Sequence, residues 1–248
     1  MSSAITSNAW LRRFRPRDSA PVRLVCLPHA GGSATYFLPV AAALDPSVDV
    51  LAVQYPGRQD RRTEPFVRTI DELAELVTEQ LSGWTDRPLA LFGHSMGATL
   101  GFEVARRLER AGTVPVALFV SGRRAPSCFR DERVHQEDDE QLLADVRALS
   151  GTDARLFGDE EIMRMVLPAL RADYEAAETY RYEPGEPLRA PVVSLVGDAD
   201  SKVTVDEARA WDRHTSGEFD FHVYPGGHFF LDEHATAVIG MIKRRLLG

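Results

Sequence analysis

The stretch Leu89–Ala98, LALFGHSMGA, places a short apolar run directly before a Gly-rich turn. Residues 93–97 of this stretch, GHSMG, fit the pattern G-x-S-x-G. When a strand precedes and a helix follows this pattern, the tight turn lifts the serine oxygen above the sheet edge. The helix behind the turn offers free backbone N–H groups and a positive dipole end. Ser95 is therefore a candidate nucleophile.

Apolar runs recur along the rest of the chain and alternate with amphipathic stretches. Most runs are continuously apolar, which favours parallel strands covered by helices on both faces. The expected strands are Val22–Leu27, Val48–Gln54, Leu89–Phe92, Val116–Val120, Val192–Val196 and Phe219–Tyr224. The expected helices include one opened by a Thr69–Glu72 capping box and ending near Trp84, one over Met96–Ala111, and one from about Asp232 to Leu247. This alternation predicts a single α/β domain over residues 1–248, with a mostly parallel central sheet flanked by helices.

One segment interrupts the alternation, because no good strand occurs between Gly122 and Pro187. Two helical patterns appear there instead, over Asp139–Leu149 and Asp159–Tyr180. Open α/β sheets bind ligands outside the carboxyl ends of their strands, so we expect residues 123–187 to form a helical lid at that edge. In the second pattern, apolar side chains at helical spacing are expected to serve core packing rather than substrate contact: Ile162, Val166, Leu170, Tyr174 and Ala177.

A serine hydroxyl needs a base to take its proton. In this kind of sheet the acid and then the histidine follow the serine along the chain. His228 fits, because it comes directly after Gly226-Gly227 and the last expected strand. Four other histidines, in expected elements or polar segments, fit less well: His135, His214, His222 and His234.

The acid that orients the histidine is expected just after the strand Val192–Val196. Asp198 and Asp200 both lie in that loop. We favour Asp200, because the loop must clear the strand end before it turns toward the histidine. Asp198 is expected to cap or tie the loop.

An oxyanion hole needs two backbone donors. One is expected at Met96, the residue after the nucleophile, and the other in the loop PHAGGS, residues 28–33. Its glycines let the backbone approach a substrate closely. We place the second donor at Ala30, with Gly31 as the alternative. His29, Gly31 and His94 are expected to line the substrate pocket.

Composition excludes several classes of protein. The 248 residues carry a formal net charge of -8, whereas nucleic-acid binders are typically basic. Cys26 and Cys128 form no disulfide framework, and Cys26, inside an apolar run, is expected to be a buried core thiol. No Cys/His cluster shows zinc spacing, and no metal or cofactor is expected. The Arg-rich start lacks a following apolar stretch and no run could span a membrane, so a cytoplasmic location is expected.

Five segments, in this order, resemble type II thioesterases, the discrete editing enzymes of polyketide and nonribosomal peptide synthetases: PHAGGSATYF, VQYPGRQDR, LFGHSMGA, GDADSKV and GGHFFL. The segment LPALRADYEAAETY of the expected lid is also similar. The resemblance covers the chain from about Arg13 to Leu247, and within the family it looks closest to the enzyme of the rifamycin pathway. It implies an α/β-hydrolase fold and a Ser95, Asp200 and His228 triad. The segment Gln54–Arg58, QYPGR, is a family mark without a catalytic role that we can derive; we expect it to shape the pocket.

The resemblance also implies a substrate and a partner. The substrate would be an acyl group on the phosphopantetheine arm of an acyl or peptidyl carrier protein, and removing stalled or wrong units would restore the carrier thiol. We expect a monomer. A chain-releasing thioesterase, an acyltransferase or a small-molecule esterase on the same fold stays open, as does a binding protein without activity.

Carrier docking is a separate question, because carrier proteins are commonly acidic and this chain is acidic too. Local basic sites would have to compensate for the unfavourable net charge. The candidates are Arg58, Arg61, Arg62, Arg123 and Arg124, with solvated surface arginines as the equal alternative.

Overall fold

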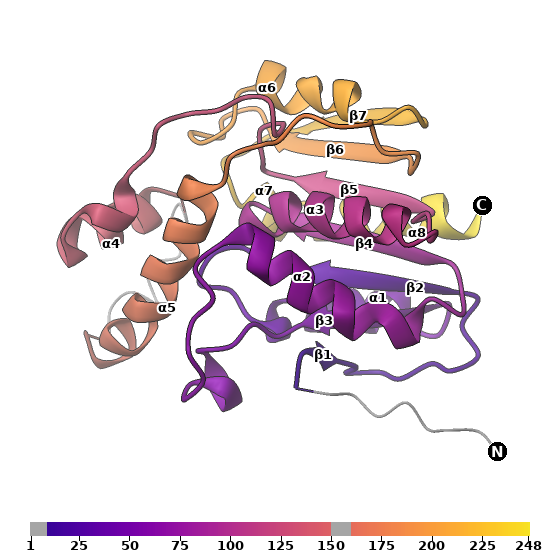
Figure 1. Ribbon diagram of the computed structural model, residues 1–248, viewed down its shortest axis with the longest axis horizontal. Helices are drawn as coiled ribbons and strands as arrows, with labels where there is room; N and C mark the ends of the chain where they lie inside the picture. Colours follow the sequence, from indigo (N-terminus) through magenta and orange to yellow (C-terminus); the bar gives the residue numbers. More distant parts are fainter. Residues whose placement is uncertain (1–8, 150–159) are drawn as a thin grey trace.

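The computed structural model describes residues 9–149 and 160–248. Within these residues seven strands form one sheet, in the order β1-β3-β2-β4-β5-β6-β7 (Figure 1). The strands are β1 (Leu11–Arg12), β2 (Val22–Leu27), β3 (Val48–Val53), β4 (Leu89–His94), β5 (Ala117–Ser121), β6 (Val192–Gly197) and β7 (Phe219–Tyr224). All neighbours are parallel except β1, which pairs antiparallel with β3. The predicted mostly parallel sheet is confirmed; β1 was missed because two residues show no periodicity.

Helices cover both faces of the sheet (Figure 1). They are α1 (Leu38–Leu44), α2 (Ile70–Leu81), α3 (Met96–Arg110), α4 (Asp139–Leu149), α5 (Glu160–Thr179), α6 (Val205–Arg209), α7 (Phe230–Glu233) and α8 (Ala235–Leu247). Successive residues of a strand point to opposite faces. Val25 and Leu27 of β2 therefore pack with α2 and α3, while Leu24 and Cys26 pack with α1 and α8.

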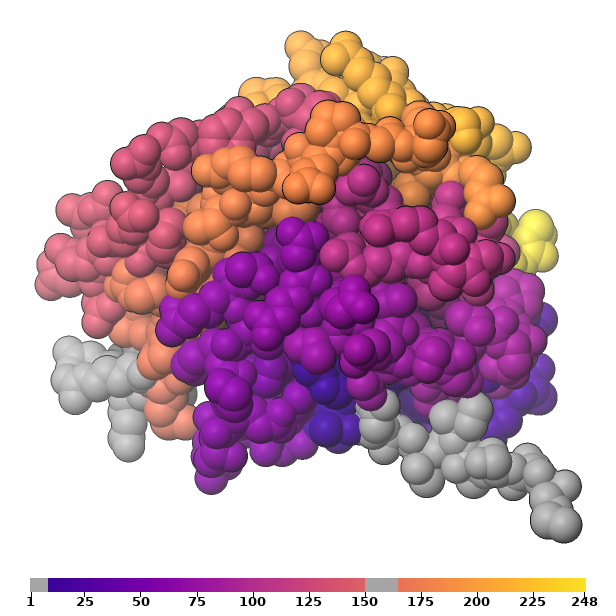
Figure 2. All heavy atoms as spheres, in the orientation of Figure 1, coloured from indigo at the N-terminus to yellow at the C-terminus, as the bar shows by residue number. Residues whose placement is uncertain are grey.

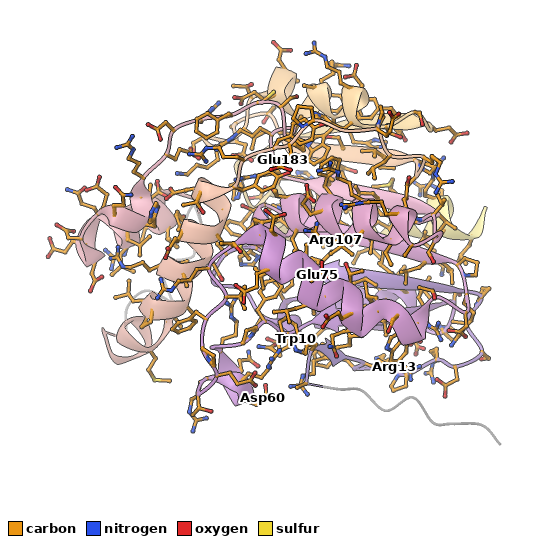
Figure 3. The ribbon with its side chains drawn as sticks, in the orientation of Figure 1. Trp10, Arg13, Asp60, Glu75, Arg107 and Glu183 are labelled. Atoms are coloured by element: carbon orange, nitrogen blue, oxygen red, sulfur yellow. The ribbon has the colours of Figure 1, made fainter. Side chains whose placement is uncertain are left out.

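The two core clusters explain the continuously apolar strands, because both faces of β2 are buried. Cys26 is fully buried, as expected, and burial raises the pKa of its thiol. On the face of the sheet that α2 and α3 cover, Arg107 of α3 forms ion pairs with Asp71 and Glu75 of α2. Figure 3 shows Arg107 and Glu75 lying between the two helices.

Two helix starts show how the predicted caps and boundaries compare with the structure. Thr69 caps α2 by accepting a hydrogen bond from the Glu72 N–H, which is one half of the predicted capping box. A complete box instead opens α6, at Thr204 and Glu207. The predicted single last helix is wrong at its start, because His234 adopts non-helical angles (φ -106°, ψ 17°) and separates α7 from α8.

The strand order creates a crevice at the carboxyl edge of the sheet. The chain passes from β2 to β3 on one side of β2 and returns to β4 on the other side. The carboxyl ends of β2 and β4 therefore form a topological switch point, where open α/β sheets bind ligands. The connection between β5 and β6 contains α4 and α5, which lie beyond this edge (Figure 1). The predicted start of the second lid helix, Asp159, lies outside the described residues.

Candidate active site

Ser95 occupies a sharp turn between β4 and α3, with φ 53° and ψ -119°. Positive φ is uncommon for a residue with a side chain, and here it turns the serine away from the helix axis. A Cβ at Gly93 would lie 2.0 Å from the Gly97 oxygen, and one at Gly97 would lie 2.1 Å from the Leu27 oxygen. The glycines of G-x-S-x-G are therefore required by the packing of the strand and helix around the turn.

The loops after β6 and β7 bring a carboxylate and an imidazole together. His228 Nδ1 lies 2.9 Å from Asp200 Oδ2, and the two side chains are 3% and 0% exposed. The other oxygen of Asp200 accepts a hydrogen bond from the Lys202 N–H at 2.8 Å. A Cβ at Gly197 would lie 2.4 Å from the oxygens of both Gly226 and Gly227, so the two loops are in direct contact. Both carboxylate oxygens are thus fixed in direction.

The competing acid and bases have other partners. Asp198 accepts a hydrogen bond from the Gly226 N–H at 2.9 Å and so ties the two loops together. The other four candidate histidines bond elsewhere: His214 with Ser127, His222 with Asp220, His234 with the Pro225 oxygen, and His135 with Glu178.

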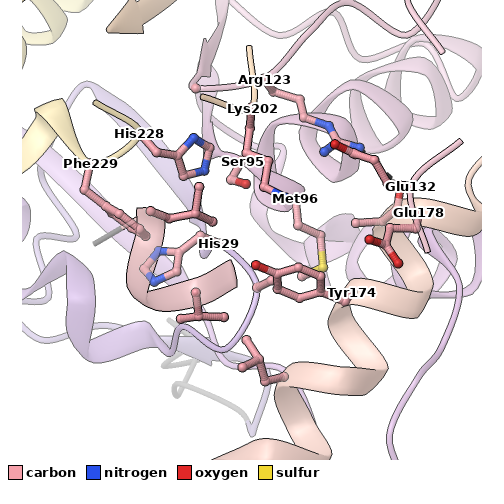
Figure 4. Close-up of a pocket in the computed structure, with 16 residues that line it drawn as sticks. His29, Ser95, Met96, Arg123, Glu132, Tyr174, Glu178, Lys202, His228 and Phe229 are labelled. Atoms are coloured by element: carbon pink, nitrogen blue, oxygen red, sulfur yellow. Dashed lines mark hydrogen bonds between the residues drawn. The ribbon is translucent and has the colours of Figure 1, made fainter. Parts of the chain in front are cut away.

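Ser95 and His228 line one cavity, and Figure 4 shows the His228 ring facing the serine. The lid contributes Leu170, Tyr174 and Ala177 of α5 to its wall. The predicted packing role is confirmed, because Leu170 and Tyr174 belong to one apolar cluster and Ala177 packs against the main core. The same three side chains also face the crevice, which the prediction did not include. Elsewhere on α5, Val166 is 38% exposed, and the Ile162 side chain lies outside the described part of the chain.

Four charged residues also line the cavity: Arg123, Glu132, Glu178 and Lys202 (Figure 4). Arg123 donates to the Thr99 hydroxyl at 2.9 Å and to the Ala177 oxygen at 3.2 Å. Burial, with the nearby Arg124, lowers the pKa of Arg123 to about 10, which leaves the guanidinium charged at neutral pH. The cavity therefore combines an apolar wall from the lid with a charged one.

The backbone donors near Ser95 are distinguished by their partners. Met96 begins α3, so its N–H has no acceptor within the helix. The Ser95 N–H is engaged, because it donates to the Ser121 oxygen at 2.8 Å. The Gly31 N–H is also engaged, with Asp173 Oδ2 at 2.7 Å, which counts against Gly31 as the second oxyanion donor. Ala30 lines the cavity and remains the favoured position.

Of the three residues expected to line the substrate pocket, only His29 lines the described cavity. His29 lines the cavity, and burial lowers its pKa to about 3, so the ring is neutral. His94 is fully buried, with Nδ1 3.0 Å from Ser121 Oγ, and it is not among the residues that line the described cavity. Gly31 also lies outside the described lining. Gly122 does line the cavity and was missed; a Cβ there would lie 2.6 Å from His94 Cε1.

The QYPGR segment supports the loop that follows β2. Gln54 Oε1 accepts a hydrogen bond from the Ala34 N–H at 2.9 Å, and the Tyr55 hydroxyl donates to the Pro28 oxygen at 3.0 Å. Arg58 donates to both oxygens of Asp173, each at 2.8 Å. The segment therefore acts on the site through the loop of residues 28–33 and the lid helix.

The arginines proposed for carrier docking are mostly unavailable to a partner. Arg58 and Arg61 are buried, the first against Asp173 and the second against Glu64. Arg124 is buried in an ion pair with Glu132. The prediction that these three arginines bind a carrier protein is wrong, because each guanidinium already pairs with a carboxylate inside the fold. Of the five, Arg62 alone is exposed.

Within residues 9–149 and 160–248, no group of three or more His, Cys, Asp and Glu side chains is placed to hold a metal ion. Nor does any helix in those ranges have the length and apolarity needed to cross a bilayer.

The model of the thioesterase domain family matches residues 22–246. The chain belongs to the thioesterase domain family. It is 52% identical to Thioesterase PikA5 of Streptomyces venezuelae, over 98% of this chain and 87% of that protein. It is 36% identical to the gramicidin S biosynthesis protein GrsT of Aneurinibacillus migulanus, over 96% of this chain and 94% of that protein.

A solved structure agrees with this membership. The type II thioesterase BorB from the borrelidin biosynthetic cluster superimposes with a TM-score of 0.93 at 55% identity, covering 97% of this chain and 99% of BorB. This thioesterase therefore has the α/β-hydrolase fold and is a thioester hydrolase. A special relation to the rifamycin pathway stays a prediction.

Proposed function

We propose that this thioesterase removes stalled or wrongly loaded acyl groups from the phosphopantetheine arm of acyl or peptidyl carrier proteins. The likeness to BorB, a type II thioesterase, and to GrsT supports this substrate class. We further propose that it works as a cytoplasmic monomer with a single domain over residues 1–248.

One observation carries the chemistry: Ser95 and His228 line the same cavity, and the far side of the His228 ring meets a buried carboxylate of Asp200 at 2.9 Å. In the proposed mechanism His228 takes the Ser95 proton as the hydroxyl oxygen attacks the thioester carbonyl. Asp200 holds the ring in the tautomer that leaves Nε2 free to accept. The N–H groups of Met96 and Ala30 donate to the oxyanion.

Departure of the thiol in the first half of the cycle needs little acid assistance. A pantetheine thiol has a pKa of about 8.5, so the thiolate leaves more readily than an alkoxide would. The C–S bond breaks, His228 passes its proton to the leaving sulfur, and the acyl group stays on Ser95 as an ester. Neutral His228 then takes a proton from water, whose oxygen attacks the ester, and gives that proton to Ser95 Oγ as the carboxylic acid is released.

We propose that the lid, residues 123–187, governs access to Ser95. Its α5 helix supplies Leu170 and Tyr174 to the cavity wall, so an acyl group must pass between the lid and the sheet edge. A disulfide or chemical cross-link that fixes the lid should therefore slow turnover of acyl-carrier substrates. Unchanged turnover would reject this role.

The proposed nucleophile is tested by Ser95→Ala, with Ser82→Ala, an exposed serine that ends α2, as the matched control. A fluorophosphonate reagent should label the wild type and the Ser82→Ala variant but not Ser95→Ala, while all three unfold at similar temperatures. Labelling that persists in folded Ser95→Ala would remove Ser95 from the mechanism.

The editing role is tested by comparing kcat/KM for acyl-carrier proteins with that for the matching acyl-pantetheine thioesters and simple esters. A strong preference for carrier-bound short acyl groups supports editing. Comparable rates on small esters would favour a general esterase, transfer to an added alcohol or amine would favour an acyltransferase, and a preference for full-length chains would favour a releasing enzyme.

A further inference from the structure

A buried ion pair joins the lid helix α5 to the segment after β3. Arg58 Nη1 lies 2.8 Å from Asp173 Oδ2, and Nη2 lies 2.8 Å from Oδ1. The two side chains are 9% and 1% exposed. Two parallel hydrogen bonds between a guanidinium and a carboxylate fix direction as well as distance. The pair therefore determines where α5 sits over the crevice.

The same two side chains hold the loop that follows β2. The Gly31 N–H donates to Asp173 Oδ2 at 2.7 Å, and Arg58 donates to the Gly32 oxygen at 3.2 Å. The helix also packs directly on the loop, because a Cβ at Gly31 would lie 2.9 Å from Leu170 Cδ1. Figure 2 shows orange atoms of the lid lying against purple atoms of a much earlier part of the chain.

The loop needs such a restraint. Two consecutive glycines follow Ala30, and Gly31 has φ +75°. Glycine occupies positive and negative φ about equally well, so these two residues by themselves restrict the loop backbone little. An oxyanion donor is useful only when it is fixed in advance at the position where the charge develops.

We propose that Arg58 and Asp173 are positioning residues that hold the Ala30 N–H in the oxyanion hole, so that the lid helix is part of the catalytic machinery. This inference rests on the proposed function, in which Ala30 is an oxyanion donor. The ion pair fixes the peptide groups that follow Ala30, and thereby the direction of its N–H. The two family segments, QYPGR and the lid helix, then act together on one backbone group.

The test replaces Asp173→Asn and uses Glu175→Gln as the matched control. Glu175 lies on the same helix and pairs with exposed Arg68, away from the glycine loop. An amide at residue 173 has one acceptor oxygen, and its NH₂ group can only donate, so it cannot accept from Gly31 and both Arg58 nitrogens at once. With an acyl-pantetheine thioester, we expect kcat of Asp173→Asn to fall about 10- to 100-fold, since loss of a whole donor costs about 100- to 1,000-fold.

Two readouts distinguish positioning from loss of structure. KM for the small thioester should stay near the wild-type value, while binding of an alkyl boronic acid, whose serine adduct mimics the tetrahedral oxyanion, should weaken by the same factor as kcat. Glu175→Gln should change neither quantity. Equal kcat in folded Asp173→Asn and Glu175→Gln, or a change confined to KM, would overturn the inference.

A second variant guards against misfolding, because removing one partner of a buried ion pair leaves an uncompensated charge. The double replacement Arg58→Met with Asp173→Leu removes both charges, and such apolar exchanges are often neutral for stability. We expect it to unfold near the wild-type temperature and still show the reduced kcat. Recovery of kcat together with stability would overturn the positioning role. A wild type without thioester turnover or serine labelling would instead overturn the proposed function.

Discussion

Replacing Asp200 with asparagine changes the hydrogen-bonding state that His228 presents to Ser95. In the wild type one carboxylate oxygen accepts from the Lys202 N–H at 2.8 Å and the other meets His228 Nδ1 at 2.9 Å. In Asp200→Asn the atom facing Lys202 must remain an oxygen, because a backbone N–H points at it. The amide NH₂ therefore faces Nδ1, which has to accept. The ring hydrogen then moves to Nε2, which can no longer take the serine proton.

The expected loss follows from this geometry. The same exchange in a serine protease lowers kcat about 10⁴-fold through the wrong tautomer. That factor corresponds to about 5.5 kcal/mol of transition-state stabilisation, at 1.36 kcal/mol for each factor of ten. The two side chains here are 3% and 0% exposed, so bulk water has no access to replace the lost interaction. We expect a loss of about this size in kcat with little change in KM.

The assay follows thiol release from a short acyl-pantetheine thioester, with thermal unfolding as the check on folding. The control is Asp198→Asn, because that amide keeps an oxygen for the Gly226 N–H. We expect the control to lie within a few-fold of the wild type. If Asp200→Asn lost less than about tenfold in kcat, or if both variants lost equally, the assignment of Asp200 would be refuted.

Three further predictions follow from individual residues. Gly97→Ala should lower unfolding stability by about 1–3 kcal/mol and reduce serine labelling, because the new Cβ would meet the Leu27 oxygen at 2.1 Å; an unchanged melting temperature would contradict this. Burial lowers the pKa of His214 from 6.5 to about 4, so the unfolded chain binds the proton more tightly. The free energy of unfolding should therefore decline as pH falls from 6.5 toward 4, and His214→Phe should flatten that decline in urea titrations. Without denaturant, a thiol reagent should modify half-buried Cys128 and spare fully buried Cys26; rapid reaction of Cys26 would count against its placement.

Local patterns in the sequence account for the elements that short-range physics determines. The elbow around Ser95 is set by two glycines within five residues, so its spacing is visible in the sequence. The positions of Asp200 and His228 follow from strand order, because parallel strands end at one edge. β1 was missed since two residues carry no pattern. His94 was misplaced because a motif does not tell which side of a turn faces the cavity.

Long-range partnerships explain the rest. Arg58 and Asp173 are 115 residues apart, and no local sequence pattern around either residue predicts that they pair. The periodicity of α5 indicates one apolar face, yet it does not distinguish packing on a core from lining a crevice. The docking arginines were misjudged for the same reason: a charged residue in sequence looks exposed until its buried partner, such as Glu132 for Arg124, is known.

The strained backbone at Ser95 matters when variants of this enzyme are selected for stability. A non-glycine residue at φ 53° and ψ -119° carries about 1–3 kcal/mol of conformational strain, which glycine at the same position would relieve. Selection for heat resistance alone would therefore favour Ser95→Gly. This variant would be more stable to unfolding but would lack the proposed nucleophile. Thermostabilised libraries of this enzyme need a simultaneous screen for turnover, since the residue at the centre of its chemistry is also one of the easiest places to gain stability.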